Sequence, residues 1–353
     1  MFSLIKREIG VKEFSFYKEE LFFLRKDGVI TLFNLDLSNR LTDPKYPGNI
    51  FLLEDHLVWQ DMFENSMIYN CLLEKIVHDG KLLEKKYMFS DIDLSTYGLI
   101  AAFSTVPTGE ETYFFDLKKS SLYPEPIHFS ISINGGKCLY GTDINRRKFF
   151  RTSLQNEVVW EFKIEGYYHN ALRDKRLVEF SSLTGLHDNV LWIVLTSGKI
   201  LGLSNETGLQ RYTLESFPIS DSDTTHQKPV ALGRSMQIDI NTGLMFGIHN
   251  KHYVELDLKQ NDLHSICTTL PKSTLDANIV GSKFPFDDDY IYFCDDRQGK
   301  IAVFDRHWKE VVWSHQLDIK QEGIAQILEM KYQDHKWYIL DRHQTLHIFE
   351  RTA

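Results

Sequence analysis

Hydrophobic and polar residues alternate in short runs along the whole chain, and polar clusters that contain glycine separate the runs. Residues 189–214 show this pattern most clearly. An apolar run at residues 190–195 precedes a turn at Ser197-Gly198, and two alternating segments with a second turn between them complete the unit. Alternation with a period of two predicts β-strands, and the polar clusters predict tight turns. We therefore expect three antiparallel strands in this unit.

Seven further copies of the unit occur along the chain. The first two contain Asp27-Gly28 and Asp79-Gly80, dipeptides that are typical of hairpin turns. Successive hairpins begin about 45 residues apart on average, which is the period of a four-stranded propeller blade. The copies lie at residues 21–35, 66–89, 97–123, 137–164, 244–266, 289–317 and 335–349.

The remaining strand of each blade should precede its hairpin, and residues 236–240, 278–284 and 325–332 are candidates. The last copy lacks an outer strand, whereas residues 2–9 form a spare alternating segment before the first copy. Pairing of these two ends would leave no sheet edge unpaired at the termini. We predict an all-β fold, a β-propeller of four-stranded antiparallel blades closed by the N-terminal strand, as a single domain over residues 1–353.

The number of hairpins favours eight blades. Because only 32 residues separate the hairpin starts at Met67 and Leu99, one unit could be imperfect, and seven blades remain the alternative. A pair of β-sandwiches is the competing architecture, but it explains the even spacing less well.

Composition and charge limit the classes of partner. The chain has 353 residues with 42% hydrophobic and 25% charged residues, which is ordinary for a globular protein. The formal net charge is −9, so nucleic acid and an anionic membrane surface are not expected as partners. Long-range attraction would instead favour another protein, and a basic one.

Targeting signals and disulfides are not expected. The N-terminus carries Lys6 and Arg7 and has no apolar core of a signal peptide, and no apolar run approaches the roughly 20 residues needed to span a bilayer. We therefore expect a cytoplasmic protein. The four cysteines are far apart and in apolar contexts, which favours buried free thiols. They are Cys71, Cys138, Cys267 and Cys294.

Three segments carry a resemblance to a known family. Residues 149–164, 201–214 and 302–317 resemble the strand-turn-strand core of quinoprotein-like (PQQ-like) propeller repeats, with Trp160 and Trp313 at matching positions of the outer strand. The regular Ala, Asp, Thr-Gly and Trp consensus of the cofactor-carrying members is absent from most copies. The resemblance therefore implies the fold and no cofactor.

No motif for chemistry stands out. The sequence contains no nucleophile elbow, kinase signature, phosphate-binding glycine loop or HExxH helix. Asp91 and Asp93 begin like a calcium loop, but Ala102 stands where the bidentate glutamate belongs. The tripeptide Asp305-Arg306-His307 has an echo at residues 341–343, at a position that is not equivalent within the blade. We predict no catalytic, cofactor-binding or metal-binding residue.

Loops are the better candidates for a working surface. Turns between the two central strands and links between blades collect on one face of a propeller, and two links are long, at residues 165–175 and 216–228. Aromatic residues and arginine are enriched at interfaces, although packing between blades is the alternative for the first link. The predicted partner-binding residues are Tyr167, Tyr168, His169, Arg173, Asp221, Asp223, His226, Asp296, Arg297 and Arg342.

Two functions from different classes follow. The first is a non-enzymatic protein-binding scaffold, for example an inhibitor-like or immunity-like protein, that uses a charged loop face. The alternative is a propeller enzyme, such as a hydrolase, lactonase or lyase, with a site at the mouth of the central channel. Polar residues on expected inner strands would form that site, and the candidates are Glu179, Asp239, Lys283 and Glu329.

Overall fold

The computed structural model consists of strands and turns, with one short 3-10 helix, η1 (Ser38–Arg40), among the described residues. It divides into two compact units. Unit 1 comprises Met1–Arg7, Arg146–Phe149 and Trp160–Ala353, and unit 2 comprises Glu8–Asn145 and Phe150–Val159. The described residues are 1–41, 48–61, 65–83, 86–89, 98–106, 109–122, 130–134, 139–143, 145–153, 157–169, 172–215, 236–249, 252–259, 264–269, 284–295, 298–319 and 326–352.

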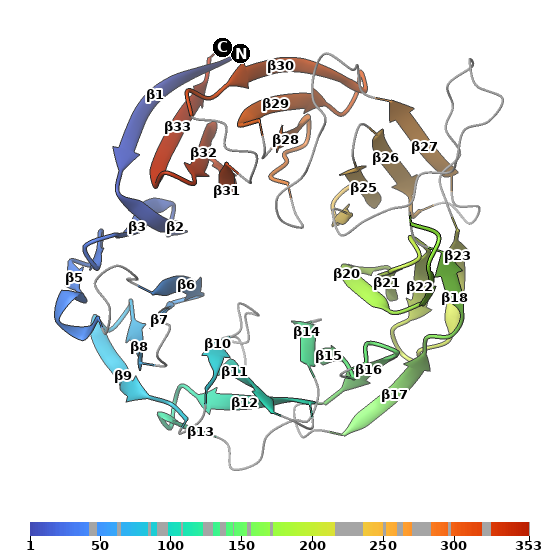
Figure 1. The fold of residues 1–353 in the computed structure, drawn as a ribbon, viewed down its shortest axis with the longest axis horizontal. Helices are drawn as coiled ribbons and strands as arrows, with labels where there is room; N and C mark the ends of the chain where they lie inside the picture. Colours follow the sequence, from blue (N-terminus) through green and yellow to red (C-terminus); the bar gives the residue numbers. More distant parts are fainter. Residues whose placement is uncertain are drawn as a thin grey trace. The chain divides into compact units, whose positions relative to one another are not determined.

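The first four blades contain four antiparallel strands each, and most of these strands are labelled in Figure 1. Blade 1 has β2 (Val11–Tyr17), β3 (Glu20–Arg25), β4 (Val29–Ile30) and β5 (Leu35–Asp36); blade 2 has β6 (Asn49–Leu53), β7 (His56–Gln60), β8 (Asn65–Asn70) and β9 (Lys75–Lys81). Blade 3 has β10 (Met88–Phe89), β11 (Leu99–Val106), β12 (Gly109–Asp116) and β13 (Ser121–Leu122); blade 4 has β14 (Ser130–Asn134), β15 (Leu139–Thr142), β16 (Lys148–Thr152) and β17 (Val158–Lys163).

The remaining four blades follow a two-stranded hairpin of β18 (Tyr167–His169) and β19 (Lys175–Leu177). Blade 5 has β20 (Phe180–His187), β21 (Val190–Leu195), β22 (Ile200–Ser204) and β23 (Gln210–Leu214); blade 6 has β24 (Gln237–Asp239), β25 (Leu244–His249), β26 (His252–Asp257) and β27 (His264–Thr269). Blade 7 has β28 (Tyr290–Asp295), β29 (Lys300–Asp305) and β30 (Glu310–Gln316); blade 8 has β31 (Ile327–Gln333), β32 (Lys336–Asp341), β33 (Thr345–Arg351) and β1 (Phe2–Ile9).

The predicted fold is confirmed: the protein is an all-β propeller with eight blades of antiparallel strands. In blade 7 the described residues contain three strands and an isolated bridge between Phe286 and Ile291. The predicted inner strand of that blade lies at residues 278–284, of which only Phe284 belongs to the described part of the chain. A single domain over residues 1–353 stays a prediction.

The assignment of the second copy was wrong. Asp79 and Gly80 lie inside β9 and form no turn, while the central hairpin of blade 2 pairs β7 with β8. The turn dipeptide misled the assignment because Gly80 has a φ of 114°, a value that glycine also adopts within an irregular strand. Counted from His56, where β7 begins, the hairpin at Leu99 follows after 43 residues, close to the period of the other copies.

The N-terminal strand completes the C-terminal blade, as predicted from the spare segment at residues 2–9. The strand order of blade 8 is β1-β33-β32-β31, so the first strand in the sequence is an outer strand beside the last one. The amide of Thr352 donates to the carbonyl of Met1 at 2.8 Å. The centre of the Phe2 ring lies 5.6 Å from that of Trp313 and 6.0 Å from that of Trp337, so the pairing also packs a half-buried aromatic side chain against blades 7 and 8.

The two central strands of blade 5 are covered on both faces, which explains their continuous apolar runs. Every residue of β21 and β22 is buried, whereas the outer strand β23 is exposed or half-buried. Trp192 stacks on Tyr212 with ring centroids 5.4 Å apart and packs with Met245 of the next blade, so this indole lies between blades 5 and 6. A Cβ on Gly202 would stand 2.9 Å from Tyr212, so only glycine fits beside this stack.

Two of the four cysteines belong to the described side chains, and both are buried free thiols, as predicted. Burial raises the pKa of Cys71 to about 11, which keeps its thiol protonated. Across the described ranges, no helix has the length and apolar character to span a membrane.

The aromatic contacts of Phe2 provide a test of the closing strand. We expect Phe2→Ala to lower the free energy of unfolding by about 2 kcal/mol, below the cost for a fully buried phenylalanine because this ring is half-buried. Urea unfolding followed by tryptophan fluorescence measures the change, since Trp313 and Trp337 lie beside the ring. Ile5→Ala is the matched control, because Ile5 lies on the same strand with 48% of its surface exposed. Equal loss in both variants would contradict this account of the closure.

Candidate functional site

The first long link, predicted as a loop at residues 165–175, contains a β-hairpin. β18 pairs antiparallel with β19 in the register Tyr167 to Leu177 and His169 to Lys175. The amide of Val178 donates to the carbonyl of Gly166 at 3.1 Å and closes the stem. Gly166 has a φ of 105°, a conformation that side chains other than glycine's rarely adopt.

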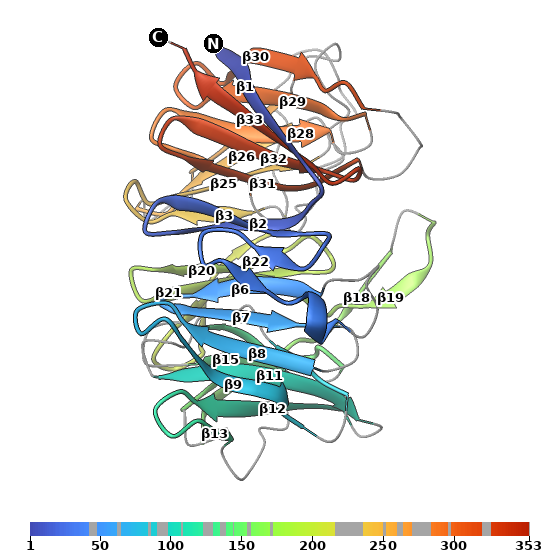
Figure 2. The same cartoon turned by 90° about the vertical axis from the view of Figure 1, so that its left-hand side faces the viewer.

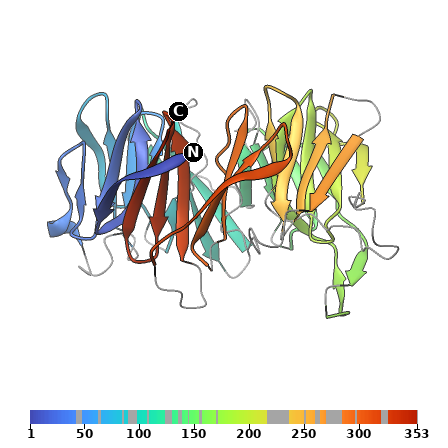
Figure 3. The ribbon, with the colours of Figure 1, turned by 90° about the horizontal axis from the view of Figure 1, so that it is seen from above.

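This hairpin, which we call the β18–β19 hairpin, projects from the strands of unit 1 (Figures 2 and 3). Tyr167 is 62% exposed and Leu172 is 81% exposed. The ammonium group of Lys175 lies 4.2 Å from the centre of the Tyr167 ring, so a cation covers part of the aromatic face. Tyr167, His169 and Arg173 are therefore not packed between blades.

The base of the hairpin lies against the β21–β22 turn of blade 5. The amide of Glu179 donates to the hydroxyl of Thr196 at 3.0 Å, and the amide of Thr196 donates back to the carbonyl of Glu179 at 2.9 Å. An open groove of about 560 Å³ lies here, lined by Tyr168, Lys175, Arg176, Leu177, Glu179 and Thr196. A second groove, of about 530 Å³, lies between β17 and the outer strands of blade 5 and includes Lys163 and Lys199.

Of the other predicted partner-binding residues, only Arg342 belongs to the described part of the chain, and it lies in blade 8 rather than in the hairpin. Arg342 is exposed in the β32–β33 turn, where its amide donates to the carbonyl of Gln326 at 2.7 Å. Five predicted residues lie outside the described part of the chain, and they are Asp221, Asp223, His226, Asp296 and Arg297. Asp91, Asp93 and Lys283 lie outside it as well.

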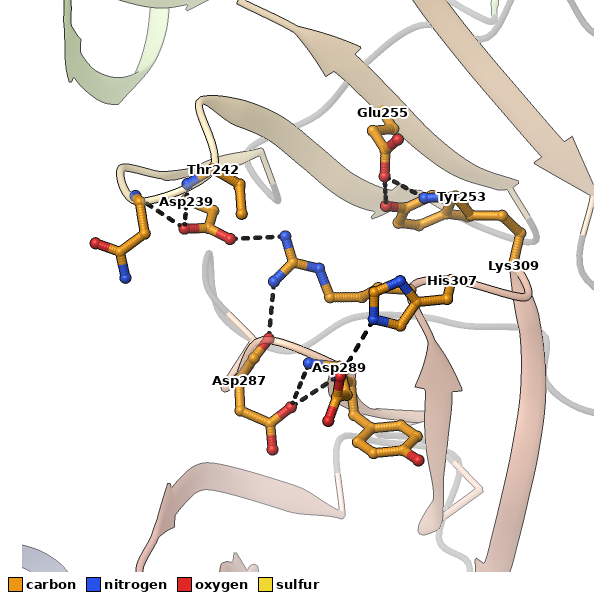
Figure 4. Close-up of polar contacts among 11 residues, drawn as sticks. Asp239, Thr242, Tyr253, Glu255, Asp287, Asp289, His307 and Lys309 are labelled. Carbon is orange, nitrogen blue, oxygen red and sulfur yellow. Dashed lines mark hydrogen bonds and ion pairs between the residues drawn. The ribbon is translucent and has the colours of Figure 1, made fainter.

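A buried arginine joins two neighbouring blades of unit 1, and sequence reasoning missed it. Arg306 follows β29, and its Nη2 lies 2.7 Å from Oδ2 of Asp239 at the end of β24 (Figure 4). Its Nη1 donates to the backbone carbonyl of Asp287 at 2.7 Å. The guanidinium lies 5.1 Å from the ring of Phe246 and 5.6 Å from that of Phe286. Both charged side chains are almost fully buried, at 4% and 3% exposure.

Two further polar pairs flank this arginine. His307 lies 3.2 Å from the carboxylate of Asp289, and Lys309 pairs with Glu255 of blade 6. Tyr253 donates its hydroxyl to the same Glu255 (Figure 4). Burial raises the pKa of Tyr253 and keeps its hydroxyl protonated as a donor.

The carboxyl of Asp239 is held ionised inside this network. Burial opposes its ionisation, but hydrogen bonds from Thr242 and Arg306 outweigh that effect and lower the pKa of Asp239. The same carboxylate caps the β24–β25 turn, because its Oδ1 accepts from the amide of Asn241 at 3.1 Å. Asp239 therefore stabilises its own turn through one carboxylate oxygen and binds Arg306 of the neighbouring blade through the other.

The one sequence feature that drew attention to this arginine is the tripeptide Asp305-Arg306-His307, which is repeated at residues 341–343. Its echo is not equivalent in the structure, because Arg306 precedes β30, the edge strand of its sheet, whereas Arg342 precedes β33, which lies between β32 and β1. Nothing in the sequence pairs Arg306 with Asp239, which lies 67 residues away.

Three of the four residues expected for an enzyme site belong to the described part of the chain, and each has a structural contact. Asp239 is held by Arg306, and the carboxylate of Glu329 lies 2.8 Å from the ammonium group of Lys331. Glu179 joins the hairpin base to blade 5 through its backbone. Among the side chains that the structure describes, no three His, Cys, Asp or Glu residues are placed to hold a metal ion.

Comparison with known proteins supports the fold and nothing finer. No family model matches the chain, and no curated protein matches its sequence. The crystal structure of BamB from Moraxella catarrhalis has a TM-score of 0.53 and 11% identity, covering 86% of this chain and 96% of that chain. The crystal structure of the computationally designed Ika8 protein has a TM-score of 0.60 and 11% identity, covering 97% of this chain and 96% of that chain. The predicted likeness to quinoprotein-like propellers thus holds at the level of the fold.

The buried ion pair predicts a large effect of removing one partner. We expect Arg306→Met to lower the free energy of unfolding by about 3–5 kcal/mol, because Asp239 then keeps a buried charge without its cation. The double variant Asp239→Asn with Arg306→Met should recover part of this loss, since the amide oxygen of Asn can still cap the turn. Urea unfolding of the four proteins in this cycle measures the coupling. The control is Arg342→Met, which should stay within about 0.5 kcal/mol of wild type.

The lowered pKa of Asp239 sets the pH range of its contribution. Its stabilisation is complete above the unfolded-state pKa of about 3.9 and disappears as the pH falls through the lower pKa of the folded state. We therefore expect the stability difference between wild type and Asp239→Asn to be constant near neutral pH and to shrink below about pH 4. Urea midpoints at a series of pH values test this. A difference that does not change down to pH 2 would contradict the ionised state of Asp239.

Proposed function

We propose that this protein is a non-enzymatic protein-binding scaffold whose contact site is the β18–β19 hairpin. The observation that carries the proposal is the projection of this hairpin from unit 1 with Tyr167 and Leu172 largely exposed. Two exposed large side chains on one short element are typical of an interface, because a partner would remove their apolar surface from water.

The strand pairing of the hairpin supports this role. Six residues are paired between β18 and β19, and the stem and base are held by backbone bonds at Gly166 and Glu179. Because the backbone of the hairpin is already ordered, it loses little further conformational entropy when a partner binds. Tyr167 also has few rotatable bonds, and tyrosine is enriched among the residues that dominate binding energy.

Local charge supports an acidic contact patch on the partner. The described part of the hairpin carries Arg173, Lys175 and Arg176 against Asp174 alone, an excess of two positive charges. Arg176 pairs with Asp174 at 3.3 Å, so Arg173 and Lys175 remain as the cations without a carboxylate partner in the hairpin. The net charge of the chain alone would favour a basic partner, but a contact depends on the charges within a Debye length of about 8–10 Å.

The two grooves near the base of the hairpin would bind side chains of the partner that extend beyond the hairpin. Their linings combine apolar and charged residues, such as Leu177 with Lys175 in one and Leu201 with Lys199 in the other. Interfaces of ordinary size bury about 800 Å² on each partner, which is more than one hairpin offers. The partner would therefore extend from the hairpin onto blade 5.

An inhibitor-like or immunity-like role is a specific version of this function. It requires that the partner be an enzyme whose activity falls when the complex forms. Its assay is the activity of the captured partner with and without an excess of this protein.

Replacement of the exposed hairpin residues tests the proposal. We expect the double variant Tyr167→Ala with Leu172→Ala to lose at least one protein that co-purifies with the tagged wild type from its native cells. With that protein purified, the variant should bind about 10–100-fold more weakly by calorimetry, the effect of losing a residue that dominates an interface.

The matched control is Leu209→Ala, which removes another exposed apolar side chain, 69% exposed, from the β22–β23 turn of blade 5. It should retain the partner with wild-type affinity. A partner that binds wild type and the hairpin double variant equally well would overturn the assignment of the contact site.

A further inference from the structure

One tryptophan differs from the others in its exposure. Trp308, in the β29–β30 turn, is 78% exposed, whereas Trp59, Trp192 and Trp337 are 2% exposed or less. From it and its neighbours we infer a second docking surface in unit 1, which binds a cationic segment of a partner protein. We call it the Trp308 surface and define it by Ile240, Asp288, Asp289, His307 and Trp308.

The backbone of the turn that carries Trp308 is fixed. The carboxylate of Asp305, which is 7% exposed, accepts hydrogen bonds from the amides of His307 and Trp308, both at 2.8 Å. The amide of Lys309 donates to the carbonyl of Asp305 at 2.9 Å and closes the turn. The indole is therefore presented to solvent on an ordered backbone.

A second ordered turn lies beside it. Ile240 is 71% exposed in the β24–β25 turn, directly after Asp239. The ion pair of 2.7 Å between Asp239 and Arg306 joins the two turns, because Arg306 stands two residues before Trp308. The buried pair thus links the two turns of adjacent blades that carry the exposed Trp308 and Ile240.

The charges around these side chains leave an excess of carboxylates. Arg306 is compensated by Asp239, and Lys309 by Glu255. Arg351 lies 3.9 Å from the carboxylate of Asp287 and is stacked 4.5 Å from the ring of Tyr290. Two exposed carboxylates remain, Asp288 without an ion-pair partner among the described residues and Asp289 with His307 as its neighbour.

An exposed indole beside uncompensated carboxylates favours a cation as the occupant. Tryptophan has the strongest cation–π attraction of the aromatic side chains, and a carboxylate forms charge-assisted hydrogen bonds with ammonium or guanidinium groups. Ile240 adds apolar surface for the methylene stem of a lysine or arginine. A segment with several such residues would engage the indole and the carboxylates together.

This surface is distinct from the proposed hairpin contact. In an antiparallel blade, the turns after the first and third strands lie at one end of the strands, and the links between blades lie at the other. Ile240 follows β24, the first strand of its blade, and the ion pair of Arg306 with Asp239 places the β29–β30 turn of Trp308 at the same end. The β18–β19 hairpin is part of a link. The inference therefore does not depend on the proposed function of the hairpin.

The test uses the full chain and a defined probe. A fluorescein-labelled octapeptide of alternating arginine and glycine is titrated with the protein at physiological ionic strength, and binding is followed by fluorescence anisotropy. We expect Trp308→Ala to weaken binding at least tenfold, and Asp288→Asn with Asp289→Asn to weaken it by a similar factor. Unfolding midpoints should not change, since Trp308 is largely exposed.

Two controls separate a specific surface from general attraction to an acidic protein. Asp334→Asn removes one exposed charge from the β31–β32 turn of the next blade and should leave affinity within twofold of wild type. An octapeptide of alternating glutamate and glycine should not bind. The inference would be overturned if Trp308→Ala bound the arginine peptide as tightly as wild type, or if Asp334→Asn weakened it as much as the double aspartate change.

A second copy of this chain is the other occupant that the experiment must distinguish. Sedimentation of wild type and Trp308→Ala over a range of concentrations would reveal self-association. A dimer that forms in wild type and is lost in Trp308→Ala would show that the surface binds another copy, and it would overturn the assignment to a separate partner.

Discussion

The constraint on which the structure depends is that the apolar central strands of a blade must be covered on both faces. A sheet that is covered by packing on only one face would leave the other apolar face in water. Blades 5 and 6 bury Trp192 and Met245 against each other, and blades 6 and 7 bury Phe246 and Phe293. Because these positions must stay apolar and closely packed, variation that serves function is left to the turns, the links and the outer strands.

The buried ion pair of Arg306 and Asp239 departs from this apolar rule. Burial of two charges costs about as much as their attraction returns, and well-packed apolar residues in their place are often as stable. The ion pair is therefore better explained as a contact that specifies one arrangement of the two turns than as a source of stability. A methionine could lie between Phe246 and Phe286, but it could not bond both Asp239 and the carbonyl of Asp287. The pair therefore fixes the positions of the two turns relative to each other.

Much of the fold could be predicted because its signals are local. Alternation and turn residues identified most of the central hairpins, and the spare segment at the N-terminus correctly predicted the strand order of blade 8. The second blade was misassigned because Asp79-Gly80 has the composition of a turn while it lies in a strand that pairs with β8. Local sequence cannot separate these cases, since the partner strand decides between them.

The candidate site was predictable only in part, for a related reason. The aromatic residues of the first long link were identified by composition, but strands of three residues such as β18 are too short for alternation to be recognised. Arg306 could not be paired with Asp239 because their contact spans 67 residues and two blades. Contacts of this kind depend on how the blades pack, and a short segment of the sequence carries no information on that packing.

The two proposed surfaces carry opposite local charge on a chain whose net charge is −9. The net charge of a protein attracts or repels a partner before the two surfaces meet, so it affects the rate of association. Contact affinity depends on nearer groups, such as Lys175 at the hairpin and Asp288 beside Trp308. A basic segment would be attracted at long range and also fit the Trp308 surface, whereas an acidic partner of the hairpin would approach against the net charge.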